Sequence, residues 1–383
     1  MYYPGIRFIQ MTERYISFSE IETFNRCRFK WDLSSANRRS IRHKTTPRLY
    51  LNLGSAVHKG LETAYQGEDP VKGIQDYMAL ELEAKTKEYV ERTGTQPWPA
   101  EFNEMNETFD LAKALVRQYF EHYGMDNPLA DQGLTYLGIE VPFKIDLSFL
   151  GPLLEGVFFC GTLDGIAVDE FGQIWIVENK TYTSKPSPED IQWHFQAQGY
   201  AVALEWLTGM SVAGVLYNGI AKKLIQEPKV LKNGLLSTDK RQVTTLVRYL
   251  AAITGSGESA DDPRFHDILS HLRGIDEQGD TRFFYREKAF FTVEQLNSWR
   301  GDFFQVVREM LSEPAVYRTI PYNGCGDCWF RDLCHTIHAN GDVDFLLEQR
   351  YTKDSYGTIN AVKGVEPKQI SSVDELKEYL ANV

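Results

Sequence analysis

The sequence has little cysteine and no long apolar run, and each shortage excludes a class of protein. Five cysteines among 383 residues are too few and too unevenly placed for a disulfide framework. Every apolar run, such as Val212 to Tyr217, is far shorter than the roughly 20 residues that cross a bilayer. The first residues also lack the charged-then-apolar order of a signal peptide. We therefore expect a protein in a reducing, cytoplasmic setting with no membrane partner.

Positive charge is also scarce. Lys and Arg number 41 against 53 Asp and Glu, a net charge of -12, which excludes a uniformly basic coat protein for nucleic acid. No Gly-x4-Gly-Lys-Ser/Thr loop occurs, so the chain contains no P-loop motor. What remains is ordinary globular composition, with 43% hydrophobic and 25% charged residues, which excludes disordered and fibrous classes. Any contact with nucleic acid must be local.

The periodicity of apolar residues changes along the chain. Helical spacing predominates up to about residue 125, and short β-rich runs separated by Gly, Pro and Asp follow from about Thr135 to Thr183. Later segments alternate between helix (Pro186 to Trp206, Val243 to Ile253, Val293 to Leu311, Val373 to Ala381) and strand (Val212 to Lys222, Arg282 to Phe291). This order predicts an α/β fold with a mixed central sheet flanked by helices. We divide the chain into a helical region (1–130), a core (131–311), a cysteine-rich segment (312–340) and a C-terminal tail (341–383).

The most informative segment is a predicted hairpin that carries two carboxylates. If Glu170-Phe171-Gly172 is a three-residue loop with Gly172 left-handed, Asp164 lies opposite Glu178 on the neighbouring strand. Opposed residues have Cβ atoms about 4.5 to 5.5 Å apart, and alternation places Lys180 on the same face as Glu178. The apolar strand before Glu178 predicts burial, where two like charges need compensation. A divalent Mg²⁺ or Mn²⁺ ion would provide it, whereas the simpler alternative is a turn contact at Asp164 and a surface ion pair of Glu178 with Lys180.

This pattern resembles the PD-(D/E)XK nuclease superfamily. Gly161-x-x-Asp164 is followed by Glu178-Asn179-Lys180 at the end of an apolar strand. Two further segments, Gly54 to Glu62 and Gln196 to Tyr200, are similar to motifs of its RecB-like branch, which includes iron-sulfur nucleases of CRISPR adaptation and phage exonucleases. The resemblance extends from about Ser17 to Cys334. It implies a restriction-endonuclease-like core and a bacterial, archaeal or phage-infected host cell.

The resemblance also implies roles for individual residues. The metal would be bound by His58, Asp164, Glu178 and the backbone carbonyl of Asn179, and it would activate a water molecule for phosphodiester hydrolysis. The catalytic residues would be Asp164, Glu178, Lys180, Gln196 and Tyr200. Lys180 would orient the water or stabilise developing charge, and Gln196 and Tyr200, one helical turn apart, would position reacting groups. On sequence alone, a structural His58 paired with Glu62 and a Tyr200 packed in the core are the alternatives.

Four of the cysteines form a second constellation. Cys325, Cys328 and Cys334 follow a C-x2-C-x5-C spacing, and Cys27 lies nearly 300 residues earlier. Four thiolates suit either tetrahedral Zn²⁺ or an iron-sulfur cluster, and the spacing alone does not decide between them. The resemblance implies a [4Fe-4S] cluster that closes a loop between the first helix and the end of the chain. Cys160, beside Gly161, is expected in the core.

A local excess of basic residues follows Cys27. The expected DNA-binding strip comprises Arg26, Arg28, Arg38, Arg39, Arg42 and Lys44. A second set of lysines, Lys222, Lys223, Lys229 and Lys232, follows the strand that begins at Val212. Charge runs of this kind are often simply solvated faces, so both sets are candidates for nucleic-acid contact and nothing more specific.

These observations favour a Mg²⁺- or Mn²⁺-dependent deoxyribonuclease. We expect an exonuclease that acts on single-stranded DNA or DNA ends, alone or beside a separate helicase or recombination protein. The alternatives are a non-catalytic nucleic-acid-binding or scaffold protein with a nuclease fold, a restriction-type endonuclease, and an iron-sulfur electron carrier or sensor. Only the last has no use for the carboxylate hairpin.

Overall fold

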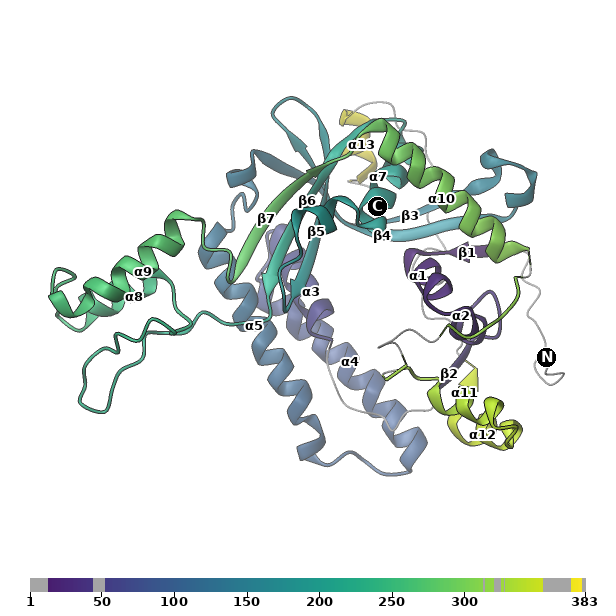
Figure 1. The fold of residues 1–383 in the computed structure, drawn as a ribbon, viewed down its shortest axis with the longest axis horizontal. Coiled ribbons are helices and arrows are strands. Elements are labelled where there is room, and N and C mark those ends of the chain that lie inside the picture. The colour runs from purple at the N-terminus through teal and green to yellow at the C-terminus, as the bar shows by residue number, and fades with distance from the viewer. Residues whose placement is uncertain are drawn as a thin grey trace.

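The computed structural model describes residues 13–43, 52–312, 314–319, 325–326, 328–353 and 373–380. In this part of the chain a six-stranded mixed sheet has helices on both faces (Figure 1). The predicted fold class, a mixed sheet flanked by helices, is therefore confirmed. No helix among these residues is long and apolar enough to cross a membrane.

The sheet is built around one long strand, β4. The strands are β1 (Arg14–Ile16), β3 (Leu134–Asp146), β4 (Val157–Asp169), β5 (Ile174–Tyr182), β6 (Val212–Ala221) and β7 (Phe284–Phe290). Strand β3 runs antiparallel along one edge of β4, and β5 (antiparallel) and β1 (parallel) pair with opposite ends of its other edge. Beyond β5 lie β6, parallel to it, and β7, antiparallel to β6. The predicted central position of β5 is confirmed, since its first six residues are buried.

One face of the sheet carries the largest apolar core. It is covered by α1 (Phe18–Arg26), α7 (Phe195–Thr208) and α10 (Val293–Leu311). Helix α1 begins earlier than the pattern Ser19-Glu20-Ile21-Glu22 indicates, because its N-cap is Ser17, which accepts a hydrogen bond from the Glu20 amide. Helix α7 packs closely here because a Cβ at Gly199 would meet the rings of Phe18 and Trp299 at about 2.5 Å or less. Helix α13 (Val373–Leu380) lies against β3 at the border of the same core.

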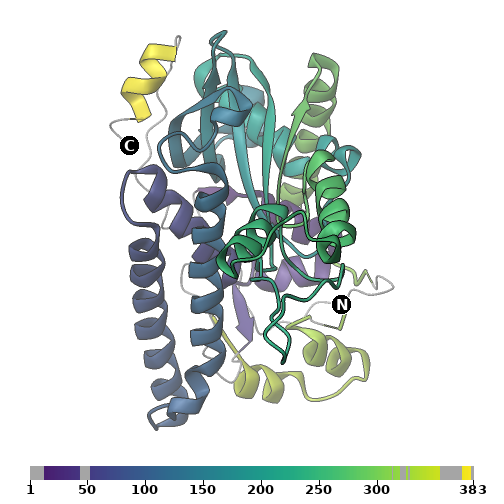
Figure 2. The same cartoon turned by 90° about the vertical axis from the view of Figure 1, so that its left-hand side faces the viewer.

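The opposite face is covered by a helical layer. Its helices are α3 (Leu53–Tyr65), α4 (Pro70–Thr93) and α5 (Asn103–Tyr123), and Figure 2 shows α4 and α5 running side by side along one edge of the molecule. The packing of α3 against α4 and α5 forms a second apolar core that includes Leu61, Ile74 and Val116. The expectation of a mainly helical region up to about residue 125 is confirmed, interrupted by the short strands β1 and β2 (Ile41–His43).

Two segments distant in sequence, residues 28–43 and 328–353, pack together in a separate small module. It consists of α2 (Arg28–Ser34), β2, α11 (Arg331–His338), α12 (Val343–Arg350) and β8 (Tyr351–Lys353). Strand β8 pairs antiparallel with β2, and Leu33, Leu333 and Tyr351 share a core. The expected C-terminal tail therefore contains a helix and a strand that the sequence analysis did not predict.

An insertion between β6 and β7, residues 222–283, completes the described fold. It carries α8 (Leu246–Gly255) and α9 (His266–Glu277), and only the first was predicted. The remaining short elements are α6 (Pro188–Gln192) and the 3-10 helices η1 (Pro99–Phe102), η2 (Ala130–Gln132), η3 (Leu147–Leu150), η4 (Pro152–Leu154) and η5 (Pro263–Phe265).

Candidate active site

The β4–β5 hairpin has the predicted register. Gly172 is left-handed (φ 78°), and the Asp169 amide donates a hydrogen bond to the Gln173 carbonyl (3.1 Å). Pairing then runs from Val168 opposite Ile174 to Gly165 opposite Val177. One step further, where the paired segment ends, are Asp164 and Glu178.

Glu178 is buried beside two charged groups. Its side chain is fully buried, and its Oε1 lies 2.5 Å from the Lys180 ammonium. Burial raises the pKa of Glu178 to about 7, and the neighbouring Asp164 also raises it, while Lys180 opposes the shift. Neither Glu178 oxygen has a hydrogen-bond partner besides this ion pair in the described residues. Such an orphaned carboxylate fits a bound cation.

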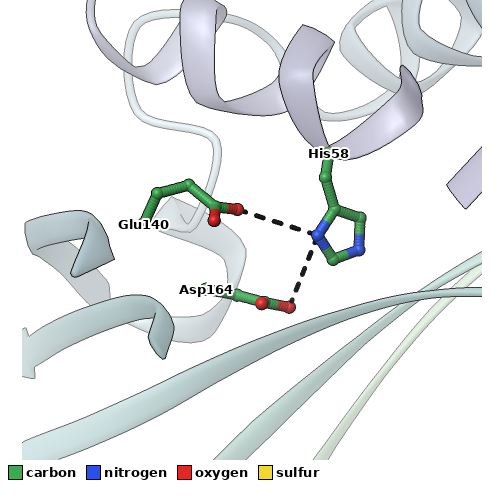
Figure 3. A group of neighbouring side chains, drawn as sticks. All are labelled: His58, Glu140 and Asp164. Atoms are coloured by element: carbon green, nitrogen blue, oxygen red, sulfur yellow. Dashed lines mark ion pairs between the residues drawn. The ribbon is translucent and has the colours of Figure 1, made fainter. Parts of the chain in front are cut away.

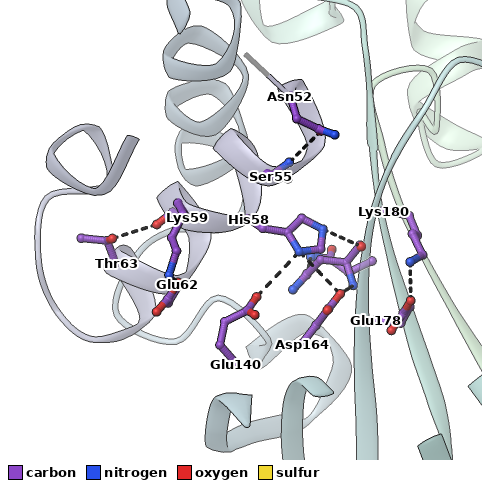
Figure 4. Close-up of polar contacts among 12 residues, drawn as sticks. Asn52, Ser55, His58, Lys59, Glu62, Thr63, Glu140, Asp164, Glu178 and Lys180 are labelled. Atoms are coloured by element: carbon purple, nitrogen blue, oxygen red, sulfur yellow. Dashed lines mark hydrogen bonds and ion pairs between the residues drawn. The ribbon is translucent and has the colours of Figure 1, made fainter. Parts of the chain in front are cut away.

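His58 reaches this edge of the sheet from α3. Its Nε2 lies 2.9 Å from the Asn179 carbonyl oxygen, and its Nδ1 lies 3.7 Å from Glu140 and 3.8 Å from Asp164 (Figure 4). Burial lowers the pKa of His58, but the hydrogen bond to Glu140 and the charges of Asp164 and Glu140 outweigh it and raise the pKa to about 9. The suggested pair of His58 with Glu62 is wrong, because Glu62 pairs with Lys59 instead.

Glu140 is a member of the site that the sequence analysis missed. His58, Glu140 and Asp164 each offer a ligand atom, all within 4.8 Å of one another, so this group could hold a metal ion (Figure 3). Glu140 lies between two β3 residues that pair across to β4 on either side of Asp164. Its backbone is left-handed (φ 49°), which is strained for a residue with a Cβ. In the sequence Glu140 is only a glutamate between two aliphatic residues of a predicted strand. Its side chain lies near His58 because of the left-handed backbone at this position, which the sequence does not reveal.

The backbone of Asn179 contacts the candidate site, and its side chain forms a hydrogen bond on the other side, within the sheet. Its amide donates to Asp164 Oδ2 (2.9 Å), and its side-chain oxygen accepts from the buried Asn218 amide (2.7 Å). Asn218 in turn donates to the Tyr119 hydroxyl (2.8 Å) and accepts from Arg286 (3.1 Å). The backbone that carries the Asn179 carbonyl is thus fixed from the α5 side of the sheet.

Gln196 and Tyr200 lie together on α7 as predicted. The Gln196 amide donates to the Tyr200 hydroxyl over 2.7 Å. Burial, and then the charges of Glu178 and Asp164, raise the pKa of Tyr200 far above its usual value, so the phenol stays neutral. Its ring also packs edge-on against Phe18, so Tyr200 belongs to the core as well as lying within electrostatic reach of the carboxylates.

His194 is a second residue that the sequence analysis missed. It precedes α7, and its Nδ1 is buried without a hydrogen-bond partner among the described residues. Burial lowers the pKa of His194, with Glu178 acting in the opposite direction. A neutral imidazole nitrogen is therefore left without a protein partner close to Glu178. Its position two residues before Gln196 was the available signal.

The cysteines Cys27, Cys325, Cys328 and Cys334 gather in the small module. Cys27 lies between α1 and α2, and Cys334 lies on α11. Burial raises the pKa of Cys334; Arg318 lowers it, and the charges of Cys27, Cys325 and Cys328 add to the increase, so the four thiols lie within electrostatic reach of one another. Cys160 is buried in β4 as expected, and burial raises its pKa to about 12.

Most of the basic strip is engaged in ion pairs. Arg38 and Arg39 both pair with the buried Asp32 (2.9 and 2.6 Å). Arg28 pairs with Glu309 (2.5 Å) and Arg42 with Glu88 (3.2 Å). Arg26 is exposed, and Lys44 lies outside the described residues. The strip therefore presents less free positive charge than its sequence suggests.

The fold and site together define a class of protein. Asp164 and Glu178 are buried on adjacent strands, Lys180 lies beside Glu178, and His58 reaches Asp164 from a helix. Candidate oxygen ligands for a cation thus lie next to a positive charge, an arrangement that suits metal-dependent hydrolysis of phosphodiesters. A model of the PD-(D/E)XK nuclease superfamily matches residues 15–335, and the chain belongs to this superfamily. A search among individual curated proteins found no match.

Proposed function

We propose that the protein is a Mg²⁺- or Mn²⁺-dependent deoxyribonuclease that degrades single-stranded DNA or DNA ends. The observation that carries this proposal is the buried Glu178 carboxylate, which lies next to Asp164 and, in the part of the chain that the structure describes, has no partner except Lys180. Two buried carboxylates beside a single ammonium leave negative charge that a bound cation would compensate. Superfamily membership supplies the reaction class, hydrolysis of a phosphodiester bond.

The residues present fit a divalent cation. We assign metal binding to His58, Glu140, Asp164, Glu178 and the Asn179 carbonyl, which provide mainly the hard oxygen ligands that Mg²⁺ and Mn²⁺ prefer. The bound ion would polarise a phosphoryl oxygen and lower the pKa of the attacking water.

The other polar residues would then act on the substrate. Glu178 and Asp164 raise the pKa of Lys180 despite its burial, so its ammonium is charged and can stabilise negative charge that develops on the phosphate. The neutral Tyr200 hydroxyl holds the Gln196 amide, which we assign to positioning the scissile strand. His194 Nδ1, which has no hydrogen-bond partner among the described residues, would donate to a phosphate oxygen in the tautomer that carries the proton on Nδ1.

The preference for single strands or ends rests on the charge distribution. The protein has a net charge of -12 and its basic strip is largely engaged in ion pairs, so the strip has little free positive charge for an extended contact with intact duplex. The sequence has no recognisable module for reading the major groove. A separate helicase or recombination protein would supply the unwound strand in this proposal.

Cleavage by matched variants tests the assignment. Glu178→Gln, Asp164→Asn and Lys180→Ala should each lower the cleavage rate by about 100-fold or more with Mg²⁺ or Mn²⁺. The control is Glu170→Gln, which neutralises an exposed acid at the turn of the same hairpin and should cleave normally. Near-normal cleavage by Glu178→Gln after metal titration would show that this hairpin is not the active site.

The substrate itself needs a separate comparison. Linear single strands should be degraded faster than closed single-stranded circles of equal sequence, and blunt duplex faster than a nicked circle. Rapid cutting of closed duplex circles at a defined sequence would identify a restriction-type endonuclease instead.

We further propose that Cys27, Cys325, Cys328 and Cys334 bind a [4Fe-4S] cluster. Four thiolates suit either tetrahedral Zn²⁺ or an iron-sulfur cluster. Zinc sites usually come as two C-x2-C pairs, whereas here one distant cysteine joins a compact C-x2-C-x5-C triplet. This cysteine pattern is what favours the cluster in our proposal.

Metal analysis of the purified protein distinguishes a [4Fe-4S] cluster from a zinc ion at the four cysteines. Protein purified without oxygen should contain about four irons per chain and absorb visible light, and Cys325→Ser should lose both properties. Cys160→Ser is the control, since Cys160 is buried in β4, where its thiol donates to the Ile16 carbonyl. Stoichiometric zinc with no iron, in protein made with adequate iron supply, would contradict the assignment.

A further inference from the structure

The insertion between β6 and β7 forms an ordered arm. Figure 1 shows residues 222–283 projecting beyond α5, with α8 and α9 at the far end, and the turned view of Figure 2 agrees. The arm has its own apolar core around Tyr249, Phe265 and Leu269. Arg248 joins it to Glu121 of α5 (2.9 Å). Its surface is therefore held in place relative to the sheet.

The arm begins at the same end of strands β5 and β6 as the candidate active site. In the parallel pair β5–β6, Lys180 lies beside Gly219. Lys222 follows three residues later, and its amide donates to the Tyr182 carbonyl (2.8 Å). At about 3.3 Å per residue, Lys222 starts the arm about 10 Å along the strand from Lys180.

The first part of the arm carries unpaired positive charge. Lys222, Lys223, Lys229 and Lys232 are exposed, and none has an ion pair among the described residues. The only acid between residues 222 and 238 is Glu227, which is paired with Arg248 (2.5 Å). These four lysines contrast with the basic strip, where an arginine must first leave Asp32, Glu88 or Glu309 before it can bind a phosphate.

An ordered turn on the same segment exposes aliphatic side chains. The Leu231 amide donates to the Leu235 carbonyl and the Ser237 amide to the Lys229 carbonyl, both over 2.8 Å. Val230, Leu231 and Leu235 are nevertheless exposed to between 41% and 59%. Aliphatic side chains beside lysines suit unstacked bases and their phosphates.

We propose that the segment 222–238 is a second nucleic-acid-binding surface, which binds the phosphates of a single strand that extends from the active site. The inference rests on the proposed function in that the strand at the active site is nucleic acid. It also assigns substrate binding to the arm in place of the ion-paired basic strip.

Direct binding tests the surface independently of cleavage. The probe is a fluorescently labelled single-stranded DNA of about 20 nucleotides, titrated by anisotropy at several salt concentrations. Replacing all four lysines by Gln should weaken binding about tenfold or more and reduce the salt slope by up to about 3, because each phosphate contact to a single strand contributes about 0.7. Replacing Lys72, Lys85, Lys113 and Lys377, four lysines outside the arm that are exposed or partly exposed and already paired with acids, is the control and should change both far less. An unchanged affinity and slope in the four-lysine variant would overturn the inference.

Substrate length gives a second readout. The four-lysine variant should show a raised KM and a normal kcat on the long strand, and normal kinetics on a chromogenic ester of a single nucleotide, which is too short to reach the arm. Equal losses on both substrates would indicate a structural defect and contradict the inference. If the wild-type protein cleaves neither substrate, the proposed function fails, while the binding titration still decides the role of the arm.

The aliphatic turn has its own variant. Leu231→Ser with Leu235→Ser should weaken binding of the single strand several-fold and leave the salt slope unchanged, since it removes apolar contact and no charge. Unchanged affinity would show that this turn is not part of the nucleic-acid-binding surface.

Discussion

His58 lies between two carboxylates and a carbonyl oxygen, an environment that favours the imidazolium. Its raised pKa of about 9 means that it carries a proton near pH 7, and this proton must leave before the nitrogen can bind a metal. Apparent Mn²⁺ affinity should therefore increase as the pH is raised from about 6 to 9, with proton release on binding. Calorimetry in buffers of different ionisation enthalpy measures that release. His58→Ala should release about one proton fewer near pH 7, and an unchanged release would contradict the role of His58 as a ligand.

Glu140 combines a candidate ligand with backbone strain. A left-handed residue with a Cβ costs about 1 to 3 kcal/mol, and glycine avoids most of this cost. Within a strand glycine is normally less stable than alanine by about 0.5 to 1 kcal/mol. We expect the reverse order here, with Glu140→Gly at least as stable as Glu140→Ala in denaturant unfolding, while both variants bind Mn²⁺ more weakly than wild type. A clearly more stable alanine variant would indicate that the backbone relaxes without strain.

At the scale of elements, Asn218 connects β5, β6, β7 and α5. It is fully buried and bonded to Asn179, Tyr119 and Arg286. Asn218→Ala leaves these partners without their hydrogen bonds and should lower the free energy of unfolding by about 1 to 3 kcal/mol. It should also weaken Mn²⁺ binding, because the Asn179 backbone loses its side-chain anchor. Asn297→Ala, at an exposed position on α10, is the matched control for both measurements.

The sequence predicted best those elements whose geometry is local. The hairpin register follows from loop length and from Gly172, and the limits of α10 follow from periodicity and the Thr292 cap, so both were predictable. Glu140 could not be predicted, because its place depends on a strained strand residue. For His194 the sequence offered only its nearness to Gln196, because its place depends on the start of α7 meeting β5 and β6. These contacts join residues distant in sequence.

The basic strip illustrates the same limit for charge. Arg38 and Arg39 read as free cations in the sequence, where Asp32 is a single acid among many bases. In the fold Asp32 is buried and accepts both arginines. Which charges remain available for a ligand is therefore a tertiary property.

At the scale of the whole molecule, the cysteine module and the nuclease sheet have separate cores. The module core contains Leu33, Leu333 and Tyr351, and the sheet core contains none of them. Loss of the proposed metal centre in Cys325→Ser should therefore open the module and leave the sheet folded. Limited proteolysis should cut within residues 314–353 while residues 52–312 stay resistant. Simultaneous digestion of both regions would show that they unfold as one unit.

The pairing of β2 with β8 also has a consequence for the order of synthesis. Residues 41–43 leave the ribosome early, yet their partner strand is residues 351–353, about 310 positions later. Pairing of such high sequence separation forms slowly, and domains that are complete earlier fold first during translation. The sheet can therefore be assembled while the N-terminal half of the module still waits for its partner. Nascent chains shorter than about 350 residues should carry β2 as an open strand edge, the stage at which the protein is most exposed to aggregation and to proteases.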